Sequence, residues 1–261
     1  MADPAGNNFA RYQRQTAFGP LAVAGQRRLA AGRVLIVGVG GLGSWAAELL
    51  ARAGVGFLRL ADADRVDRTN IHRQSLYDED DARVRRPKVE AAAARLARIN
   101  ADVTVEPVAA RLDADNVAAL ADGVDLILDG TDNFPSRFVL NDYAVQAGRP
   151  WVFAGVVGAE GQVLPVLPGR TACLRCLYDA PPPPCQDPSC QAAGVLGPAV
   201  AAISAVQAAE AVKILSGRIE AVRGHLLKLD LWRNTVQRID TGSPRADCEC
   251  CVRRRFEYLH P

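Results

Sequence analysis

Short apolar runs alternate with amphipathic stretches over the first 157 residues of this 261-residue chain. The apolar runs have the length of strands, and the stretches between them are long enough for helices. This alternation is typical of a parallel sheet with helices on both faces, because each crossover between parallel strands needs a helix-length connection. We expect strands at residues 34–37, 57–61, 103–108, 126–128 and 151–157.

The segment after Lys88 shows the helical part of this pattern. Its apolar residues recur at helical spacing, whereas Arg95 and Arg98 lie off that stripe and can face water. The stripe consists of Val89, Ala92, Leu96 and Ile99. We therefore expect an ordinary crossover helix here.

The pattern changes after residue 157. Residues 158–161 predict a turn, and residues 162–167 predict a strand that returns antiparallel. Five prolines at residues 180–190 exclude a helix or a central strand there and predict a long loop. The remaining expected elements are a helix at 199–215 and a hairpin of strands at 225–231 and 235–239. The predicted fold class is α/β, with a Rossmann-like, mainly parallel sheet flanked by helices and with antiparallel C-terminal strands.

Composition narrows the class of protein. With 49% hydrophobic residues, the chain can bury one large core, and we expect a single domain over residues 1–261. Lysine and arginine number 31 against 29 acidic residues, so a net charge of +2 argues against nucleic acid as a partner. The polar start of the chain and the shortness of its apolar stretches predict a cytoplasmic protein without a membrane span.

A glycine-rich turn follows the first expected strand. Such a turn needs glycine, because tight curvature and the close approach of a pyrophosphate leave no room for a Cβ atom. The helix that begins there can direct its free amides at phosphate. The residues concerned are Gly38, Gly40, Gly41, Leu42 and Gly43. Asp62, at the end of the second expected strand, has the position of a ribose-binding acid. A nicotinamide-dependent oxidoreductase and an adenylating enzyme fit these residues equally well.

Charged residues after Asp62 favour the adenylating enzyme. The set is Asp64, Asn70, Arg73 and Lys88. Cations beside a helix N-terminus suit the negative charge of a polyphosphate better than they suit a nicotinamide. A solvated charged loop explains Arg65 and Arg68, but it explains the whole set poorly.

The chain resembles the ThiF/MoeB (HesA/MoeB/ThiF) family of ubiquitin-activating-type adenylyltransferases, which activate small sulfur-carrier proteins. The resemblance covers nearly the whole chain. It rests on residues 11–15 (RYQRQ), the glycine turn, Asp62 with Asp64, and residues 70–74 (NIHRQ), 87–90 (PKVE) and 129–133 (DGTDN). It implies ATP as the nucleotide, with Gly41 and its neighbours cradling phosphate, Asp62 on the ribose, and Asn70, Arg73 and Lys88 on the phosphates.

The resemblance also implies roles outside this set. Asp132 would position Mg²⁺ and the reacting α-phosphate with Asn133 nearby, and the attacking carboxylate would need no protein nucleophile. A helix cap by Asp132 or Asn133 is the structural alternative. Arg14, in the N-terminal helical segment 1–30, would reach into the partner's site in a homodimer. Residues 31–157 would form the nucleotide-binding core, and residues 158–261 the portion that binds the carrier and zinc.

Two cysteine pairs at Cys-x-x-Cys spacing, with 71 residues between them, indicate a zinc ion held by four thiolates. The expected ligands are Cys173, Cys176, Cys248 and Cys251, and the ion would stabilise the C-terminal tail against the body. Cys250 could replace one ligand of the second pair, and a redox-active pair is the rival interpretation. Family resemblance agrees with the structural zinc.

Cys190, in the proline-rich loop, stands where family members often carry a reactive thiol, and Cys185 lies close to it. A role in sulfur transfer and a free loop cysteine both fit. The predicted function is ATP-dependent adenylation of the C-terminal glycine of a ubiquitin-like carrier ending in Gly-Gly, before thiocarboxylate formation. We expect the sulfur to come from an external cysteine desulfurase or rhodanese. The alternative functions are adenylation of a peptide C-terminus, a non-enzymatic scaffold and the nicotinamide-dependent oxidoreductase.

Overall fold

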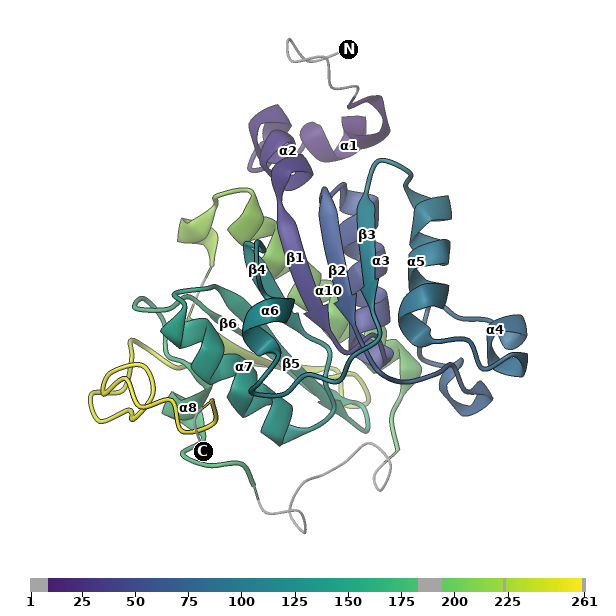
Figure 1. Ribbon diagram of the computed structural model, residues 1–261. Coiled ribbons are helices and arrows are strands. Elements are labelled where there is room, and N and C mark those ends of the chain that lie inside the picture. Colours follow the sequence, from purple (N-terminus) through teal and green to yellow (C-terminus); the bar gives the residue numbers. More distant parts are fainter. Residues whose placement is uncertain (1–8, 183–193, 223, 260–261) are drawn as a thin grey trace.

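The computed structural model describes residues 9–182, 194–222 and 224–259. Its strands form one mixed sheet in the order β3-β2-β1-β4-β5-β6-β7-β8 (Figure 1). The first five strands are parallel, and β6, β7 and β8 continue the sheet antiparallel. Their bounds are β1 Arg33–Val37, β2 Phe57–Ala61, β3 Thr104–Val108, β4 Leu126–Asp129, β5 Trp151–Val157, β6 Glu160–Val166, β7 His225–Asp230 and β8 Thr235–Asp240.

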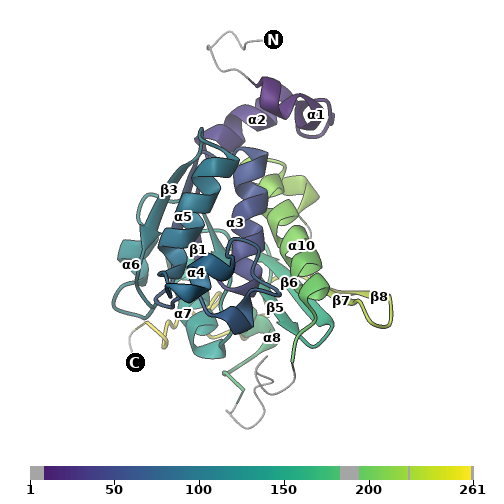
Figure 2. The ribbon, with the colours of Figure 1, turned by 90° about the vertical axis from the view of Figure 1, so that its right-hand side faces the viewer.

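Helices cover both faces of the sheet. The main helices are α2 Ala22–Ala31, α3 Gly41–Ala53, α5 Lys88–Ile99, α7 Phe134–Gln146 and α10 Gly197–Leu215. Shorter ones are α1 Gln13–Thr16, α4 Glu79–Arg83, α6 Val117–Leu120 and α8 Leu174–Leu177, with 3₁₀ turns at Ala10–Tyr12, Arg68–Asn70 and Ile219–Ala221. Figure 2 shows α3, α5 and α10 side by side on one face, whereas α6 and α7 lie on the other.

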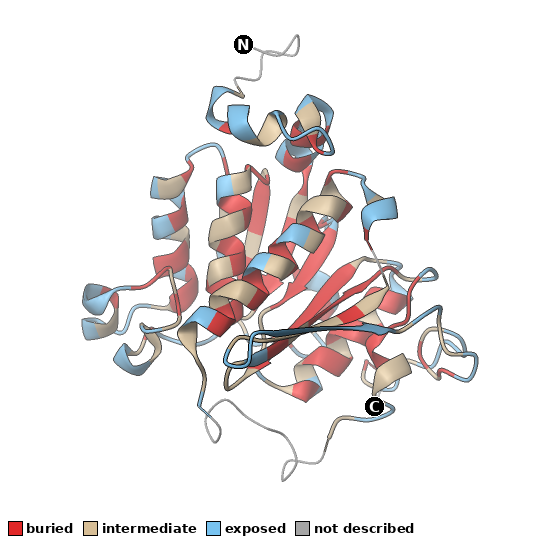
Figure 3. Ribbon diagram, turned by 180° about the vertical axis from the view of Figure 1, so that it is seen from behind, coloured by how far each residue is buried: buried red, intermediate tan, exposed pale blue. Residues whose placement is uncertain are grey.

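Alternate residues of β1 enter different cores, as the pleat of a strand requires. Val34 and Ile36 belong to the core under α3, α5 and α10. Leu35 and Val37 belong to the core under α6, α7 and the C-terminal segment. Strands buried on both faces read as continuous apolar runs, which explains why the central strands were visible in the sequence. In Figure 3 the central strands and the inward helix surfaces are buried, while the outward helix surfaces and strand β8 are exposed.

Helix α10 is long and apolar enough to cross a membrane by length and composition alone. In the fold it packs against α3, β5 and β6 instead, and it belongs to the first core. Its apolar character is therefore that of a core helix.

The predicted fold class is confirmed. Every expected strand is present, with bounds that differ by at most a few residues from those predicted. The strand order reverses between β1 and β4, since β2 and β3 lie on one side of this pair and β5 lies on the other. Open parallel sheets bind their ligands at such a switch point, beyond the carboxyl ends of the strands.

Candidate active site

A pocket of about 720 Å³ opens at the carboxyl ends of the parallel strands. The pocket is lined by the glycine turn after β1, the loop after β2, the start of α5 and the loop after β4. The expected site residues that line it are Gly38, Gly40, Gly41, Leu42, Asp62, Asp64, Asn70, Arg73, Lys88, Asp132 and Asn133. The tertiary structure thus gathers residues that lie almost a hundred positions apart in sequence into one cavity.

The glycine turn has a backbone that side chains would block. Gly38 adopts a φ of +81°, where L side chains are strained, and a Cβ atom there would lie 2.6 Å from the Gly130 carbonyl oxygen. Gly43 lies outside the pocket lining, and a Cβ atom on it would lie 1.9 Å from the Gly38 carbonyl oxygen. Gly43 therefore lets α3 pack closely on the turn, while Gly38, Gly40 and Gly41 face the cavity.

Asp62 braces the glycine turn. Its Oδ2 accepts a hydrogen bond from the Val39 amide at 2.7 Å, and its Oδ1 accepts one from the Asp64 amide at 2.8 Å. Both oxygens are thus held by backbone donors, and each retains acceptor capacity for a ligand hydroxyl. The carboxylate is fixed in orientation at the place where a ribose would lie in a dinucleotide fold.

Lys88 is a buried cation at the pocket wall. Its side chain is only 7% exposed, and its Nζ lies 2.9 Å from Asp64 Oδ2. Asp64 itself is 55% exposed and also lies 3.7 Å from Arg111. A buried ammonium needs an anionic partner, and here that partner reaches into solvent. A phosphate entering the pocket can therefore approach Lys88 without disrupting the core.

Arg73 and Asn70 act as one unit. Arg73 Nη2 donates to Asn70 Oδ1 at 2.7 Å, and Arg73 Nη1 donates to the Thr69 carbonyl oxygen at 3.3 Å. His72 Nε2 lies 3.0 Å from Arg73 Nη1. These contacts orient a guanidinium at the cavity wall, where its fork geometry matches phosphate oxygens.

Asp132 and Asn133, the two candidate helix caps in the loop after β4, have different environments. Asn133 caps α7, since its Oδ1 accepts a hydrogen bond from the Ser136 amide at 2.9 Å. Asp132 is exposed and lines the pocket, and its Oδ1 accepts a hydrogen bond from Asn133 Nδ2 at 3.4 Å. The capping interpretation therefore holds for Asn133. The Asp132 carboxylate presents oxygen ligands of the kind that Mg²⁺ prefers.

A buried ion pair supports this loop. Arg137 Nε donates to Asp129 Oδ2 at 3.2 Å, and Arg137 Nη2 donates to the Thr131 carbonyl oxygen at 2.9 Å. Asp129 Oδ1 accepts from the Thr131 amide and hydroxyl at 2.8 and 2.6 Å. Burial raises the pKa of the Asp129 carboxyl, and the Arg137 guanidinium opposes that shift. Asp129 and Arg137 thus both hydrogen-bond to Thr131, the residue that precedes Asp132.

The sequence analysis assigned no role to several polar residues in the lining, among them Gln74, Arg111 and Arg137. Gln74 is 3% exposed, and its Oε1 has no hydrogen-bond partner among the described residues, so it can accept from a ligand or water. Its place within residues 70–74 was the available signal. No local pattern marked Arg137, whose partners are Asp129 and Thr131.

Arg14, an expected catalytic residue, does not line the pocket of its own chain. Arg14 is exposed in α1, at the amino-terminal edge of the sheet, whereas the pocket opens at the carboxyl ends of the strands (Figure 1). Within one chain, Arg14 does not join the site. Cys190, like Cys185, falls outside the described residues.

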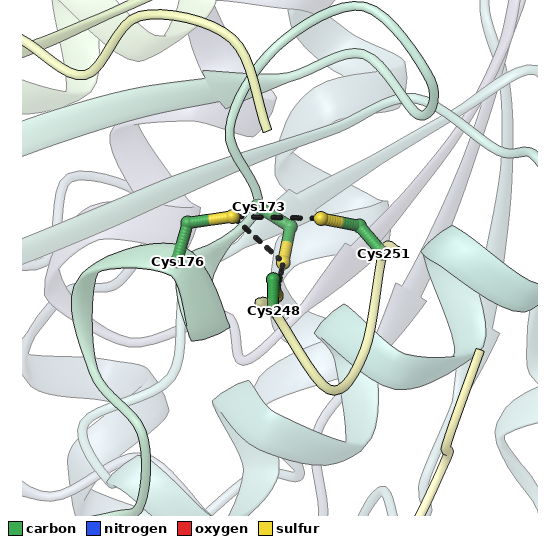
Figure 4. Close-up of side chains that lie close together, drawn as sticks. All are labelled: Cys173, Cys176, Cys248 and Cys251. Atoms are coloured by element: carbon green, nitrogen blue, oxygen red, sulfur yellow. Dashed lines mark hydrogen bonds between the residues drawn. The ribbon is translucent and has the colours of Figure 1, made fainter. Parts of the chain in front are cut away.

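The four expected zinc ligands meet in space (Figure 4). The Sγ atoms of Cys173, Cys176, Cys248 and Cys251 all lie within 4.8 Å of one another. Cys173 lies 3.9 Å from Cys176 and 3.7 Å from Cys248, and Cys176 lies 3.4 Å from Cys251. Four thiolates around one zinc ion are about 3.8 Å apart, given Zn–S bonds of about 2.3 Å. The cluster therefore fits a tetrahedral zinc ion.

The surroundings of the cluster separate Cys250 from the four ligands. Asn141 of α7 donates from Nδ2 to Cys250 Sγ at 3.3 Å and accepts from the Leu174 amide at 2.8 Å. It thereby joins the two cysteine loops. The Arg245 amide lies 3.4 Å from Cys176 Sγ, as expected of a donor that supports a thiolate ligand. The group that can bind metal is thus the expected one, with Cys250 beside it.

Comparison with known proteins agrees with this geometry. The model of the ThiF family matches residues 12–250. The sulfur carrier protein ThiS adenylyltransferase of Bacillus subtilis is 39% identical over 250 residues, which cover 95% of this chain and 73% of that protein. The SAMP-activating enzyme E1 of Haloferax volcanii is 40% identical over 241 residues, covering 92% of this chain and 88% of that enzyme.

Two further comparisons concern a longer relative and a solved structure. The adenylyltransferase and sulfurtransferase MOCS3 of Sus scrofa is 41% identical over 94% of this chain, which spans 53% of that protein. The crystal structure of E. coli MccB with ATP superposes with a TM-score of 0.80 at 23% identity, over 94% of this chain and 75% of that chain, and shows the shared fold. From the family match and the identities, this chain belongs to the ThiF family.

Proposed function

We propose that this chain adenylates the C-terminal glycine carboxylate of a ubiquitin-like sulfur-carrier protein, with ATP as the second substrate and pyrophosphate as the leaving group. The observation that carries the proposal is the convergence of the glycine turn, Asp62, Arg73, Lys88 and Asp132 on one pocket. The named adenylyltransferase relatives, at 39% and 40% identity, support the same reaction.

The chemistry follows from the charges in the cavity. The amides at the start of α3 and the cations Arg73 and Lys88 face the phosphates, with Asp62 on the ribose hydroxyls. The carrier carboxylate attacks the α-phosphorus, the bond to the β-phosphate oxygen breaks, and pyrophosphate leaves with its electron pair. Negative charge grows at the phosphate oxygens, and the two fixed cations offset it. Mg²⁺, held by the Asp132 carboxylate, would neutralise phosphate charge in the same place.

The proposal includes a homodimer with Arg14 acting across the interface. Arg14 lies at the opposite edge of the sheet from the pocket of its own chain, so it can approach a pocket only as part of another subunit. An arginine from a partner adds a cation at the triphosphate without belonging to the chain that binds it.

Sulfur transfer forms the later part of the proposal. The carrier acyl-adenylate would receive sulfur from an external cysteine desulfurase or rhodanese, with Cys190, or Cys185 beside it, as the candidate thiol on this chain. The cysteine cluster would hold a structural zinc ion and take no part in adenylation, because it lies outside the residues that line the pocket. A cytoplasmic location agrees with this use of cysteine as a metal ligand.

Pyrophosphate exchange tests the proposal directly. The purified chain is given ATP, Mg²⁺ and one of several carriers that end in Gly-Gly, of the ThiS type and the MoaD type, and exchange of labelled pyrophosphate into ATP is measured. We expect exchange with at least one carrier and none with the same carrier lacking its last glycine. Exchange supported by a short peptide but by no carrier would instead establish the peptide carboxylate as the substrate.

A further inference from the structure

Three hydrogen bonds tie the segment that carries Arg73 to the glycine turn and the start of α3. The Tyr77 hydroxyl donates to the Val39 carbonyl oxygen at 2.7 Å. Trp45 Nε1 donates to the Arg73 carbonyl oxygen at 3.1 Å, and the Ser75 amide donates to Ser44 Oγ at 3.2 Å. We call Tyr77, Trp45 and Ser44 the clasp. Its three side chains lie outside the lining of the pocket.

Tyr77 holds the centre of the glycine turn. The Val39 amide donates a hydrogen bond to Asp62, and the Val39 carbonyl oxygen accepts one from the Tyr77 hydroxyl. Both backbone polar groups of Val39 are therefore hydrogen-bonded. Tyr77 is 5% exposed and packs in the core under α3. Burial, together with the charge of Asp62, raises the pKa of Tyr77 well above its ordinary value. The hydroxyl therefore keeps its proton and acts as a donor.

Ser44 and Trp45 hold the other end of the segment. They follow Gly43 directly and lie in the first turns of α3, the helix whose amides point at the pocket. Through them, the Arg73 carbonyl oxygen and the Ser75 amide are attached to that helix. The clasp thus connects two of the parts of the pocket that carry positive charge, namely the helix N-terminus and the Arg73–Asn70 unit.

We propose that the clasp sets the spacing between Arg73 and the glycine turn, and that Tyr77, Trp45 and Ser44 are positioning residues for the triphosphate. The proposal rests on the function proposed above and deepens it. Guanidinium and amide donors must meet the same phosphate oxygens at hydrogen-bond distance, so a small displacement of one group loses affinity. Adenosine has no phosphate and would not sense the displacement.

The substitution Tyr77→Phe removes one buried oxygen and tests this. Calorimetry should show ATP affinity, measured with Mg²⁺, weaker by about five- to tenfold, the loss expected when one buried hydrogen bond is left unmade. Affinity for adenosine should stay within about twofold by the same reasoning. A matched control is Thr171→Val, which removes the hydroxyl that the Leu167 amide contacts at 2.8 Å, outside the pocket lining. That variant should bind both ligands as the unmodified chain does.

A double substitution separates positioning from general destabilisation. In an Arg73→Ala background, Tyr77→Phe should weaken ATP binding by less than about twofold further, because the group that the clasp positions is gone. Equal losses for ATP and adenosine, unchanged ATP affinity, or fully additive losses would each overturn the proposal. If the unmodified chain binds ATP but exchanges pyrophosphate with no carrier, the proposed function fails while the clasp remains tested by the affinities.

Discussion

The pocket and the cysteine cluster are both assembled from residues far apart in sequence, but they differ in what their polar atoms are free to do. In the pocket, Asp132 is exposed, Asp64 is 55% exposed, and the Gln74 carbonyl oxygen has no partner within the part of the chain that the structure describes. In the cluster, four thiols face one another, and Cys173 and Cys248 are fully buried. The pocket retains capacity for a substrate, whereas the cluster can satisfy one ion completely.

Their positions in the sheet explain this difference. Parallel strands end together, so the loops after β1, β2 and β4 meet at one open edge, where the glycine turn lies beside charged groups such as Asp62, Arg73 and Asp132. The cysteine loops instead lie against α7 on a face of the sheet, where Asn141 joins them. Closed four-ligand sites are structural, and sites that act on a substrate keep an open position. We therefore assign catalysis to the first region and stability to the second.

The largest expected effect comes from removing a cation from the pocket. Lys88→Met should reduce pyrophosphate exchange by about 100-fold or more, because a fixed cation beside the developing charge is lost. Stability should change little, since Asp64, which Lys88 contacts, is 55% exposed and can be solvated. Thermal unfolding provides that control.

Arg14→Ala should depress exchange by about tenfold, as the loss of a cation acting on phosphate charge would, and should leave the proposed homodimer intact. Mixing and refolding Arg14→Ala with Lys88→Met chains provides a sharper measurement. If Arg14 acts in trans, mixed dimers contain one complete site and recover part of the exchange. Failure to recover any activity in verified mixed dimers would place Arg14 outside the active site.

The next effect concerns the second region. Cys248→Ser should lose bound zinc and lower the melting temperature by about 10 °C. A metal that binds only the folded chain contributes several kcal/mol to stability, and each kcal/mol lost lowers the melting temperature of a chain of this size by about 2–4 °C. ATP affinity at room temperature should remain within about threefold if the two regions are independent. Elemental analysis and calorimetry measure both.

Cys250→Ser is the matched variant, since Cys250 contacts Asn141 and lies two residues from Cys248. It should retain about one zinc ion per chain, as a site with four other thiolates requires. Loss of zinc in Cys250→Ser with retention in Cys248→Ser would exchange the roles of the two residues.

The smallest expected effect concerns Asn133, which caps α7 and also lines the pocket. Asn133→Ala should lower stability by about 1 kcal/mol, because the Ser136 amide loses its cap, and Asn133→Ser should restore most of it. If Asn133→Ser also restores exchange, Asn133 acts only as the cap. If stability returns but exchange does not, the amide contacts the nucleotide, as the family resemblance implies.

Much of the fold was readable from the sequence because burial on both faces makes strands such as β1 and β5 continuous apolar runs. The glycine turn and the cysteine pairs were readable because backbone sterics and metal geometry demand particular residues at particular spacings. Arg137 was missed because its role depends on Asp129 and on Thr131, with which it forms a buried network that no local pattern encodes.

The sequence by itself therefore determined the order of strands and helices, the glycine-rich turn and the two cysteine pairs, since all of these follow from local periodicity and stereochemistry. The tertiary structure decided which four thiols face one another. Only the tertiary structure decided that Asn133 caps α7 while Asp132 faces the cavity, and that Gly43 serves packing rather than the pocket. It also showed that Tyr77 reaches Val39 across 38 residues of chain. These outcomes depend on which side chains meet after the sheet has formed, and hydrogen-bond geometry in three dimensions leaves no trace in the one-dimensional pattern.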